Sequence, residues 1–369
     1  MCKTFLLIVC SLFSLNICAQ VFESKLVDAL TKQDIPDAFV FISNSSISAL
    51  SEVDGTFTID RSALPNSEIV ISHINYETKY LQPEDITSTL ETIYLHPTNH
   101  SFEEVVLKSK KSKKRKKWLE RFTKSLLGST KNSSESKLLN PEVVLFKESD
   151  NSLIATAKDH LVFRNEKLGY NLLFLLEEYA LEKNDDVIYS GKIFFEEYKT
   201  ISHAQRANRK EVFERSSRKF FKDYAAGSHD TLQYNVALAT LEGNGFFHYL
   251  GEMKRNNLVS QDSISDLVEL KFRRFLRIEN KAIDSNQKAR NTTVRGFGSI
   301  SVQDAASKKP KNKQDKSMYA VSYLKSKSNM IIVNKEGVIQ NQKDIVEYGY
   351  WSELRLADRL PDDFQYVSN

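Results

Sequence analysis

Histidine and carboxylate side chains hold most catalytic metals and supply most general acids and bases, so their spacing limits the chemistry that a chain can perform. The chain has seven histidines. Only His96 and His100 stand four residues apart, as in a helical zinc motif. Pro97 lies between them and breaks a helix, and the glutamate of such a motif is absent. The histidines therefore predict no metal site.

The residues needed for nucleophilic or phosphate chemistry are also missing from the sequence. All three cysteines lie within the first 18 residues. The segment Gly296-Phe-Gly-Ser299 has neither the spacing of a nucleophile elbow nor the Lys-Ser/Thr of a phosphate-binding loop. We therefore expect no catalytic residues, no cofactor and no enzymatic activity.

Two alternatives stay open. One is a hydrolase or glycan-processing enzyme that uses the paired glutamates Glu177-Glu178 and Glu196-Glu197. It would need a deep pocket that joins two such carboxylates at about 5–10 Å. The other is a carrier of an apolar ligand, with an apolar cavity between a sheet and a pair of helices.

The segment Lys108–Lys117 has an unusual concentration of positive charge. Its eight basic residues are Lys108, Lys110, Lys111, Lys113, Lys114, Arg115, Lys116 and Lys117, and it contains no acid. Without Lys3 the chain has 51 basic and 48 acidic residues, and without this segment as well the basic count falls to 43. Because the remainder is mildly acidic, we expect no nucleic acid partner.

The basic segment leads into a short amphipathic helix, in which Trp118, Phe122 and Leu126 fall at helical spacing. One interpretation is that Lys108–Lys117 contacts an anionic lipid or lipopolysaccharide surface, with Trp118 at the interface. The other is that the lysines form a solvated linker and that Trp118 and Phe122 pack on the following domain.

Residues 1–20 have the layout of a secretory signal peptide. Lys3 supplies a positive charge, Phe5–Cys18 is an almost uncharged apolar run, and Ala19-Gln20 ends the segment. The run is shorter than the roughly 20 residues of a membrane-spanning helix. We expect export to the periplasm or to the periplasmic face of the outer membrane. A lipidated Cys18 and a buried N-terminal strand are the alternatives.

Residues 21–107 predict a module of short strands separated by turns. The strand candidates are Phe22–Val27, Asp37–Ile42, Val53–Ile59, Ile69–Ile74 and Thr92–Leu95. Asp54-Gly55 fits a tight hairpin turn, after which Phe57 and Ile59 alternate with threonines. Regularly spaced short strands indicate a β-sandwich or barrel.

Five motifs follow one another in this module: Lys25–Asp28, Ile35–Ala38, Asp54–Phe57, Ile71–Glu77 and Phe102–Leu107. In this order they resemble the carboxypeptidase regulatory-like domain, although Ser24 and Asn75 stand where that family usually has glycine. The resemblance implies a transthyretin/Ig-like β-sandwich without catalytic residues. It also implies an envelope protein of Gram-negative bacteria, in which such a module precedes a partner domain.

Residues 139–369 predict an antiparallel α+β domain, after a linker and helix over residues 108–138. Strands are expected at 142–146, 153–157, 161–163, 172–176, 186–195, 267–278, 319–325 and 330–333, and a polar loop at 305–317. An inserted helical pair is expected, one helix carrying Val212, Ser216, Phe220 and Tyr224, the other Leu232, Val236 and Ala239, with Ser228 or Asp230 as its N-cap. Motifs such as Gly349–Trp351 resemble the domain that follows regulatory-like modules in some envelope proteins, and that resemblance implies no activity.

These features together predict a mainly β, α+β protein: an N-terminal β-sandwich, then an antiparallel domain with an inserted helical pair. The expected function is that of a non-catalytic structural or binding protein of the bacterial cell envelope, in which the sandwich is a docking or spacer module. The expected partner is an envelope protein or another outer-membrane component, with the anionic surface as a further contact.

Overall fold

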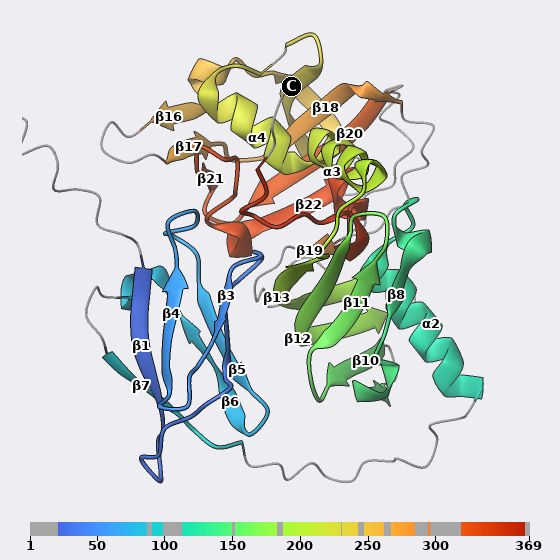
Figure 1. The fold of residues 1–369 in the computed structure, drawn as a ribbon. Helices are drawn as coiled ribbons and strands as arrows, with labels where there is room; N and C mark the ends of the chain where they lie inside the picture. Colours follow the sequence, from blue (N-terminus) through green and yellow to red (C-terminus); the bar gives the residue numbers. More distant parts are fainter. Residues whose placement is uncertain are drawn as a thin grey trace, which may run out of the picture. The chain divides into compact units, whose positions relative to one another are not determined.

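The computed structural model describes residues 21–86, 91–98, 113–149, 152–182, 187–229, 231–242, 247–261, 267–284, 294–295 and 319–365. The chain divides into two compact units, Met1–Ser101 (unit 1) and Phe102–Asn369 (unit 2). Strands predominate in both (Figure 1), which confirms the predicted mainly β, α+β class. The predicted signal peptide, residues 108–112 of the basic segment and the polar loop at 305–317 lie outside the described residues.

Unit 1 contains two small β-sheets, with the strand orders β4-β1-β7 and β3-β2-β5-β6. Its elements are β1 (Val21–Asp28), β2 (Phe39–Ile42), β3 (Ser48–Leu50), β4 (Thr56–Asp60), β5 (Ile69–His73), β6 (Tyr76–Leu81), η2 (Pro83–Asp85) and β7 (Glu91–Leu95). Strand β7 runs parallel to β1, and the other pairs are antiparallel. Side chains of both sheets, among them Leu26, Phe57 and Ile71, form one buried core, as in a β-sandwich.

The turn at Asp54-Gly55 differs from the predicted hairpin. Gly55 has the expected left-handed backbone, with φ +78°. However, the flanking strands β3 and β4 belong to different sheets. The Leu26 N–H donates to Gly55 O at 2.9 Å, so the turn packs against β1 while the chain crosses between the sheets.

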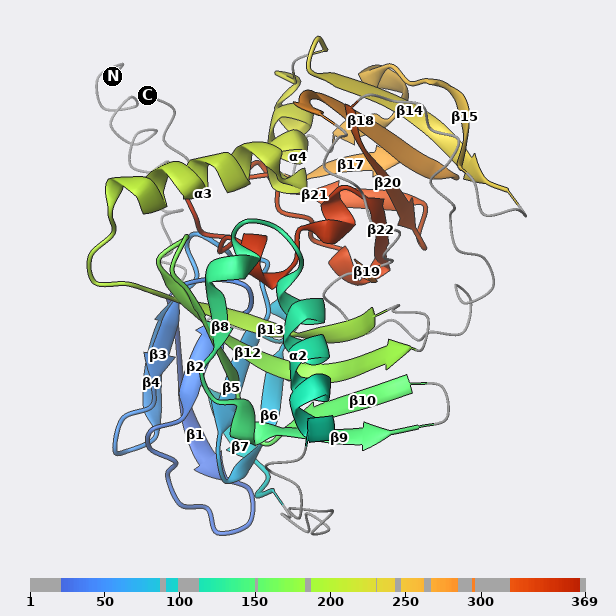
Figure 2. The same ribbon diagram turned by 90° about the vertical axis from the view of Figure 1, so that its right-hand side faces the viewer.

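The first lobe of unit 2, residues 113–197, has a six-stranded antiparallel sheet with the order β8-β11-β12-β10-β9 and β13 paired to β12. Its elements are α2 (Lys113–Leu127), η4 (Ser133–Glu135), β8 (Ser136–Leu138), η5 (Pro141–Val143), β9 (Val144–Glu148), β10 (Ser152–Ala157), β11 (Leu161–Asn165), β12 (Tyr170–Glu182) and β13 (Val187–Glu197). Helix α2 lies against this sheet (Figure 2) and buries Phe122, Leu126 and Leu127 in its core.

The second lobe of unit 2, residues 234–349, has two sheets, with the orders β15-β14-β18-β20-β22-β19 and β16-β17-β21. Its elements are β14 (Tyr234–Leu241), β15 (Phe247–Glu252), η6 (Arg255–Asn257), β16 (Val259–Gln261), β17 (Val268–Lys271), β18 (Phe275–Asp284), β19 (Val294–Arg295), β20 (Tyr319–Ser326), β21 (Met330–Val333), η8 (Gln342–Asp344) and β22 (Ile345–Gly349). Leu276, Leu324 and Ile331 lie at the centre of its core.

Two segments join the lobes. Helices α3 (His203–Arg215) and α4 (Ser217–Ala226) lie end to end (Figure 2). Helix α3 contributes Val212 to the first core, and α4 contributes Phe220 to the second. The C-terminal segment contains η9 (Trp351–Glu353) and η10 (Leu356–Asp358). Here Trp351 belongs to the second core and Leu356 to the first, so both segments cross the boundary between the lobes.

The structure divides the single helix that was predicted through Val212 and Tyr224. Ser216 has an extended backbone, with φ −80° and ψ 158°, and its hydroxyl accepts from Lys219 N at 3.2 Å, as an N-cap does. The helical spacing continues across this break, so spacing alone did not reveal it.

The second predicted helix, through Leu232 and Val236, was wrong, because this segment is strand β14. The strand pairs with β15 on one side and β18 on the other, and Leu232 is 83% exposed. A short apolar run is compatible with the residue spacing of a helix and with that of a strand, and here the pairing with neighbouring strands favours the strand. Ser228 N donates to Asp223 O at the end of α4 instead of capping a new helix, and Asp230 lies outside the described residues.

Candidate functional site

A cavity of about 500 Å³ lies between the two lobes of unit 2. Three segments line it: the loop after α2, the last turns of α3, and the C-terminal segment. The lining residues are Ser129, Thr130, Lys131, Asn132, Glu211, Val212, Arg215, Tyr350, Glu353, Leu354 and Asp358. Boundaries between domains are frequent places for small-molecule sites, so this cavity is the candidate functional site.

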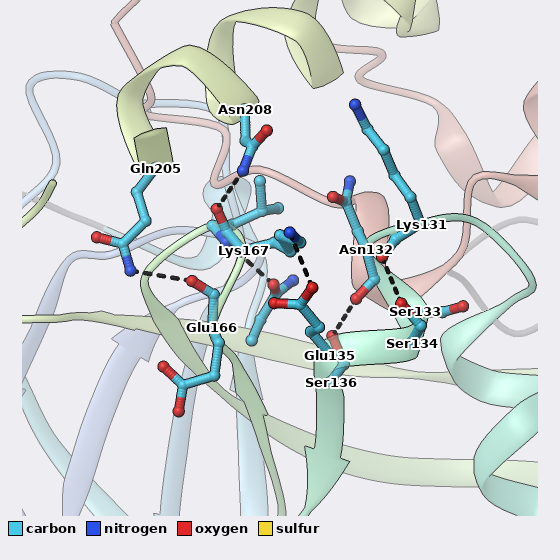
Figure 3. A network of polar contacts seen from close by, with 12 residues as sticks. Lys131, Asn132, Ser133, Ser134, Glu135, Ser136, Glu166, Lys167, Gln205 and Asn208 are labelled. Atoms are coloured by element: carbon cyan, nitrogen blue, oxygen red, sulfur yellow. Dashed lines mark hydrogen bonds and ion pairs between the residues drawn. The ribbon is translucent and has the colours of Figure 1, made fainter. Parts of the chain in front are cut away.

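The loop from Gly128 to Asn132 forms the first wall. Gly128 has φ +89°, and a Cβ at this position would lie 3.2 Å from Glu353 O, so glycine allows the C-terminal segment to approach closely. The Ser136 hydroxyl donates to Asn132 O at 2.9 Å and fixes the end of the loop (Figure 3).

Helix α3 forms the second wall, and polar side chains hold it against the first lobe. Gln205 donates to Glu166 O at 2.9 Å and Asn208 donates to Lys167 O at 3.1 Å, both in the turn between β11 and β12 (Figure 3). The Lys167 ammonium in turn lies 2.8 Å from a carboxylate oxygen of Glu135, before β8. This network ties the turn to both the helix and the η4 segment.

The buried side chain of Arg209 also holds helix α3 against the first lobe. Its Nε donates to Leu168 O at 2.6 Å and its Nη2 to Gly169 O at 3.2 Å. The guanidinium also pairs with Glu197 and lies 3.8 Å from the centre of the Tyr170 ring. Arg209 is 6% exposed, so these contacts replace its hydration almost completely.

The C-terminal segment forms the third wall and is attached to both lobes. The indole N–H of Trp351 donates to Arg215 O at 3.1 Å, and the amide of Asn165 donates to Ala357 O at 2.9 Å. Tyr350, just before η9, and Asp358, at the end of η10, both belong to this wall of the cavity.

Asp358 is the buried charged residue of the cavity wall, 7% exposed. The Thr130 hydroxyl and the Asn132 amide each donate to its carboxylate at 2.8 Å. Burial raises the pKa of Asp358 to about 6, against these two hydrogen bonds and the nearby Arg359 and Arg215. Asp358 forms no ion pair with any residue that the structure describes.

The cavity also contains a group of three paired charges. Lys131 pairs with Glu211, and Arg215 Nη2 lies 2.8 Å from Glu211 Oε1. The hydrogen bond from Lys131 lowers the pKa of Glu211, so this carboxylate is ionised at neutral pH. Burial raises the pKa of Tyr350 to about 12, although Arg215 opposes the shift, so the phenol stays protonated.

A smaller cavity of about 70 Å³ shares Val212, Leu354 and Asp358 with the first. Glu347 and Asp362 are among the residues that line it. Burial raises the pKa of Glu347 and raises that of Asp362 to about 6. The boundary between the lobes thus holds three carboxyl groups that desolvation makes harder to ionise.

The predicted basic contact is described only from Lys113 onward, and Lys108, Lys110 and Lys111 lie outside the described residues. Lys113, Lys116 and Lys117 are exposed in the first turns of α2. They lie apart from the lining of the cavity.

The other members of the predicted contact are engaged within unit 2. The Lys114 ammonium lies 2.6 Å from Glu148 Oε2 and 4.9 Å from the centre of the Trp118 ring. Arg115 donates to the backbone carbonyl of Pro141, before β9, and to that of Val144, at the start of β9, at 3.0 Å each. Trp118 is half-buried, with its ring 5.9 Å from that of Phe146. These contacts give Trp118 a packing role that needs no membrane.

The four glutamates of the hydrolase hypothesis lie outside the cavity. Glu177 and Glu178 are exposed on β12, and Glu196 and Glu197 are exposed at the end of β13. Glu178 on β12 pairs with Ser190 on β13. Glu196 is six residues further along β13, so the two glutamate pairs are about 20 Å apart along the strands. The two pairs are too far apart to act on one bond.

The cavity residues themselves were not predicted from the sequence. Thr130 and Asp358, for example, are hydrogen-bonded although 228 residues separate them. Tyr350 lies in the motif Gly349–Trp351, but that resemblance implied no role for it. Thr130 lies in the loop after α2 and Asp358 in the short η10 helix, where no periodicity marks them.

The sequence matches no family model, and no curated protein matches it significantly. In the part of the chain that the structure describes, no three histidine, cysteine or acidic side chains gather as metal ligands. No helix in that part has the length and apolarity to cross a membrane.

Proposed function

We propose that this protein is a non-catalytic binding protein of the bacterial cell envelope, and that unit 2 binds a small charged ligand in the cavity between its lobes. The observation that carries the binding role is the cavity of about 500 Å³, whose wall combines the buried Asp358 with the charges of Lys131, Glu211 and Arg215. Small-molecule sites commonly have volumes of about 300–1,000 Å³.

The envelope location rests on the sequence. Residues 1–20 have a signal-like layout, and the chain after Cys18 is free of cysteine. The resemblance of residues 21–107 to a carboxypeptidase regulatory-like domain points the same way, and the two facing sheets of unit 1 are compatible with a docking or spacer module. The partner of that module would be an envelope protein or another outer-membrane component.

The lining of the cavity favours a charged ligand over the two alternative functions. An apolar ligand would remove water from Asp358, which has no ion-pair partner among the described residues, and from the paired charges of Lys131, Glu211 and Arg215, which is costly. The hydrolase alternative relied on two of the paired glutamates meeting in one pocket. None of the four glutamates proposed from the sequence lines the cavity.

Fragment binding to residues 21–369 tests the proposal. Saturation-transfer NMR would compare cationic, anionic and neutral fragments on the wild type and on Ser129→Trp, which places an indole at the exposed edge of the cavity. Ser149→Trp is the matched control, because Ser149 is exposed in the turn between β9 and β10 and lies outside the cavity lining. We expect charged fragments to bind, and their signals to be lost in Ser129→Trp alone. Equal signals in all three proteins would refute a binding role for this cavity.

A further inference from the structure

The orientation of the Asn132 amide is fixed by Asp358. A carboxylate accepts hydrogen bonds only, so the amide nitrogen of Asn132 faces Asp358 Oδ1, at 2.8 Å, and the amide oxygen faces away from it. Asn132 is 2% exposed, and no described residue donates to this oxygen. Figure 3 shows the side chains of Asn132 and Lys131 pointing in the same direction, away from β8. Asn132 lines the cavity, and its amide oxygen is a buried acceptor without a donor among the described residues.

A second hydrogen-bond acceptor, the carboxylate of Asp358, lies beside the Asn132 amide and can accept further hydrogen bonds. The carboxylate of Asp358 takes one bond from Thr130 and one from Asn132, which leaves further lone pairs. It carries a charge that no described residue neutralises by direct pairing. Because its bond to the Asn132 nitrogen is short, the amide oxygen lies within about 5 Å of the carboxylate.

We propose that the ligand of this cavity carries a primary ammonium group, which donates to the amide oxygen of Asn132 and pairs with the carboxylate of Asp358. This inference rests on the proposed binding function and specifies its ligand. An ammonium group has three donors on one atom and can reach both acceptors at once. A neutral hydroxyl or a water molecule would satisfy the oxygen of Asn132 but leave the charge of Asp358 unpaired.

A divalent metal ion fits the same two acceptors less well. Calcium takes about 6–8 oxygen ligands, usually including several carboxylates. Asp358, Glu211 and Glu353 all line the cavity, but among the described residues no three acidic, histidine or cysteine side chains gather as metal ligands. Glu211 is already paired with Lys131 and Arg215. Those two cations also make a second ammonium or a metal unfavourable at that end of the lining.

Matched pairs of amines and their N-acetyl derivatives test the inference. Suitable probes are n-butylamine, ethanolamine and glycylglycine, each with a single amino group, titrated into residues 21–369 at pH 7.5 by NMR. We expect each amine to bind about tenfold or more tightly than its N-acetyl counterpart, since losing one partner of a buried charge pair is costly. Asp358→Asn should abolish the difference.

Glu148→Gln is the control, because it makes the same chemical change at an exposed residue of β9 that does not line the cavity. We expect the preference for amines to remain within about threefold in this variant. The wild type supplies a second measurement that needs no variant. Its affinity for amines should fall as the pH drops below about 6, when Asp358 is protonated but the amines stay charged. Arg215, Arg359 and Tyr350 face the same carboxyl group. Asp362 in the adjoining smaller cavity also has a pKa raised to about 6, so the fall should be absent in Asp358→Asn, which keeps Asp362.

The outcomes separate this inference from the proposed function. If fragments bind in the cavity but N-acetyl derivatives or anions bind as well as amines, the binding function stands and the ammonium ligand is wrong. An equal loss of amine binding in Glu148→Gln and Asp358→Asn would also contradict it, because overall charge would then decide. If no fragment depends on the cavity, the proposed function fails first.

Discussion

Replacing Asp358 with asparagine is predicted to stabilise the protein at neutral pH. An asparagine here keeps an acceptor for the Asn132 amide and presents an N–H to the Thr130 oxygen, which can accept it. The two contacts therefore survive in neutral form. What disappears is a buried charge that forms no ion pair with the described residues.

The size of the effect follows from the pKa of Asp358. This pKa is about 6 in the folded protein, against 3.8 for an unperturbed carboxyl group. A difference of about two units corresponds to roughly 3 kcal/mol by which folding disfavours the ionised form. Between pH 3.8 and about 6 the folded state binds more protons at this group than the unfolded state, so its contribution to the free energy of unfolding falls as the pH rises.

The full cost is thus present at pH 7 and small near pH 4. For Asp358→Asn at pH 7 we expect a gain of about 2–3 kcal/mol, or roughly 5–10 °C in melting temperature for a domain of this size. At pH 4 the variant and the wild type should melt within about 2 °C of each other. Differential scanning calorimetry of residues 21–369 at both pH values measures this.

Glu211→Gln is a control of opposite sign. The pKa of Glu211 is lowered by Lys131, so its stabilising contribution is present above the unfolded pKa and is lost as the pH falls through the folded pKa. This variant should be less stable than the wild type at pH 7 and closer to it at pH 4. A lower melting temperature of Asp358→Asn at pH 7 would falsify the reasoning, because it would mean that the ionised carboxylate stabilises the fold.

Three further predictions concern the walls of the site and the basic helix. Arg209→Ala should lower the free energy of unfolding by about 3 kcal/mol or more, because the carbonyls of Leu168 and Gly169 lose their buried donors; urea unfolding measures this, and a loss below 1 kcal/mol would contradict it. Gly191→Ala should lower the free energy of unfolding by about 2–3 kcal/mol, because a Cβ on β13 would lie 2.7 Å from an atom of the Phe174 ring and overlap the neighbouring strand. Urea unfolding checks this as well, and an unchanged midpoint would show that the strands move apart freely. Replacing the exposed Lys113, Lys116 and Lys117 with glutamine should weaken binding to anionic vesicles about hundredfold at low salt, at about 1 kcal/mol per lysine, measured by co-sedimentation. The triple arginine variant should bind like the wild type. If the glutamine variant also binds like the wild type, the membrane contact lies elsewhere.

The strands of the protein were largely predictable because their signals are local. Thr56–Asp60 alternates apolar and polar residues, and in the structure its apolar residues Phe57 and Ile59 are buried. The helices were less predictable. Ser216 is compatible with a helical face and with an N-cap, and the apolar run of Tyr234–Leu241 fits a helix or a strand. In both cases the contacts of distant elements decide between two locally acceptable conformations.

The candidate site was not predictable because its residues have no common local pattern. Asp358 and Asn132 belong to short irregular segments, and they meet only because the C-terminal segment crosses from the second core back to the first. The sequence directed attention instead to the basic segment and to paired glutamates, where like charges stand side by side. Clustering along the chain indicates exposed charge, whereas the charge that matters here is single and buried.

A single buried carboxylate that lowers stability is best understood together with the ligand that would neutralise it. The cost of about 3 kcal/mol at Asp358 is paid only while the cation is absent, since a bound ammonium replaces the lost hydration with a direct pair. A ligand at about a hundred times its dissociation constant stabilises the folded state by about 2.7 kcal/mol, which is comparable. The saturated wild type and the unliganded Asp358→Asn variant should therefore melt at similar temperatures. Because Tyr350 adjoins the second core and Asp358 adjoins the first, a ligand in this cavity would also connect the two lobes. Ligand binding would then stabilise the association of the two lobes, and the melting temperature of unit 2 would report both.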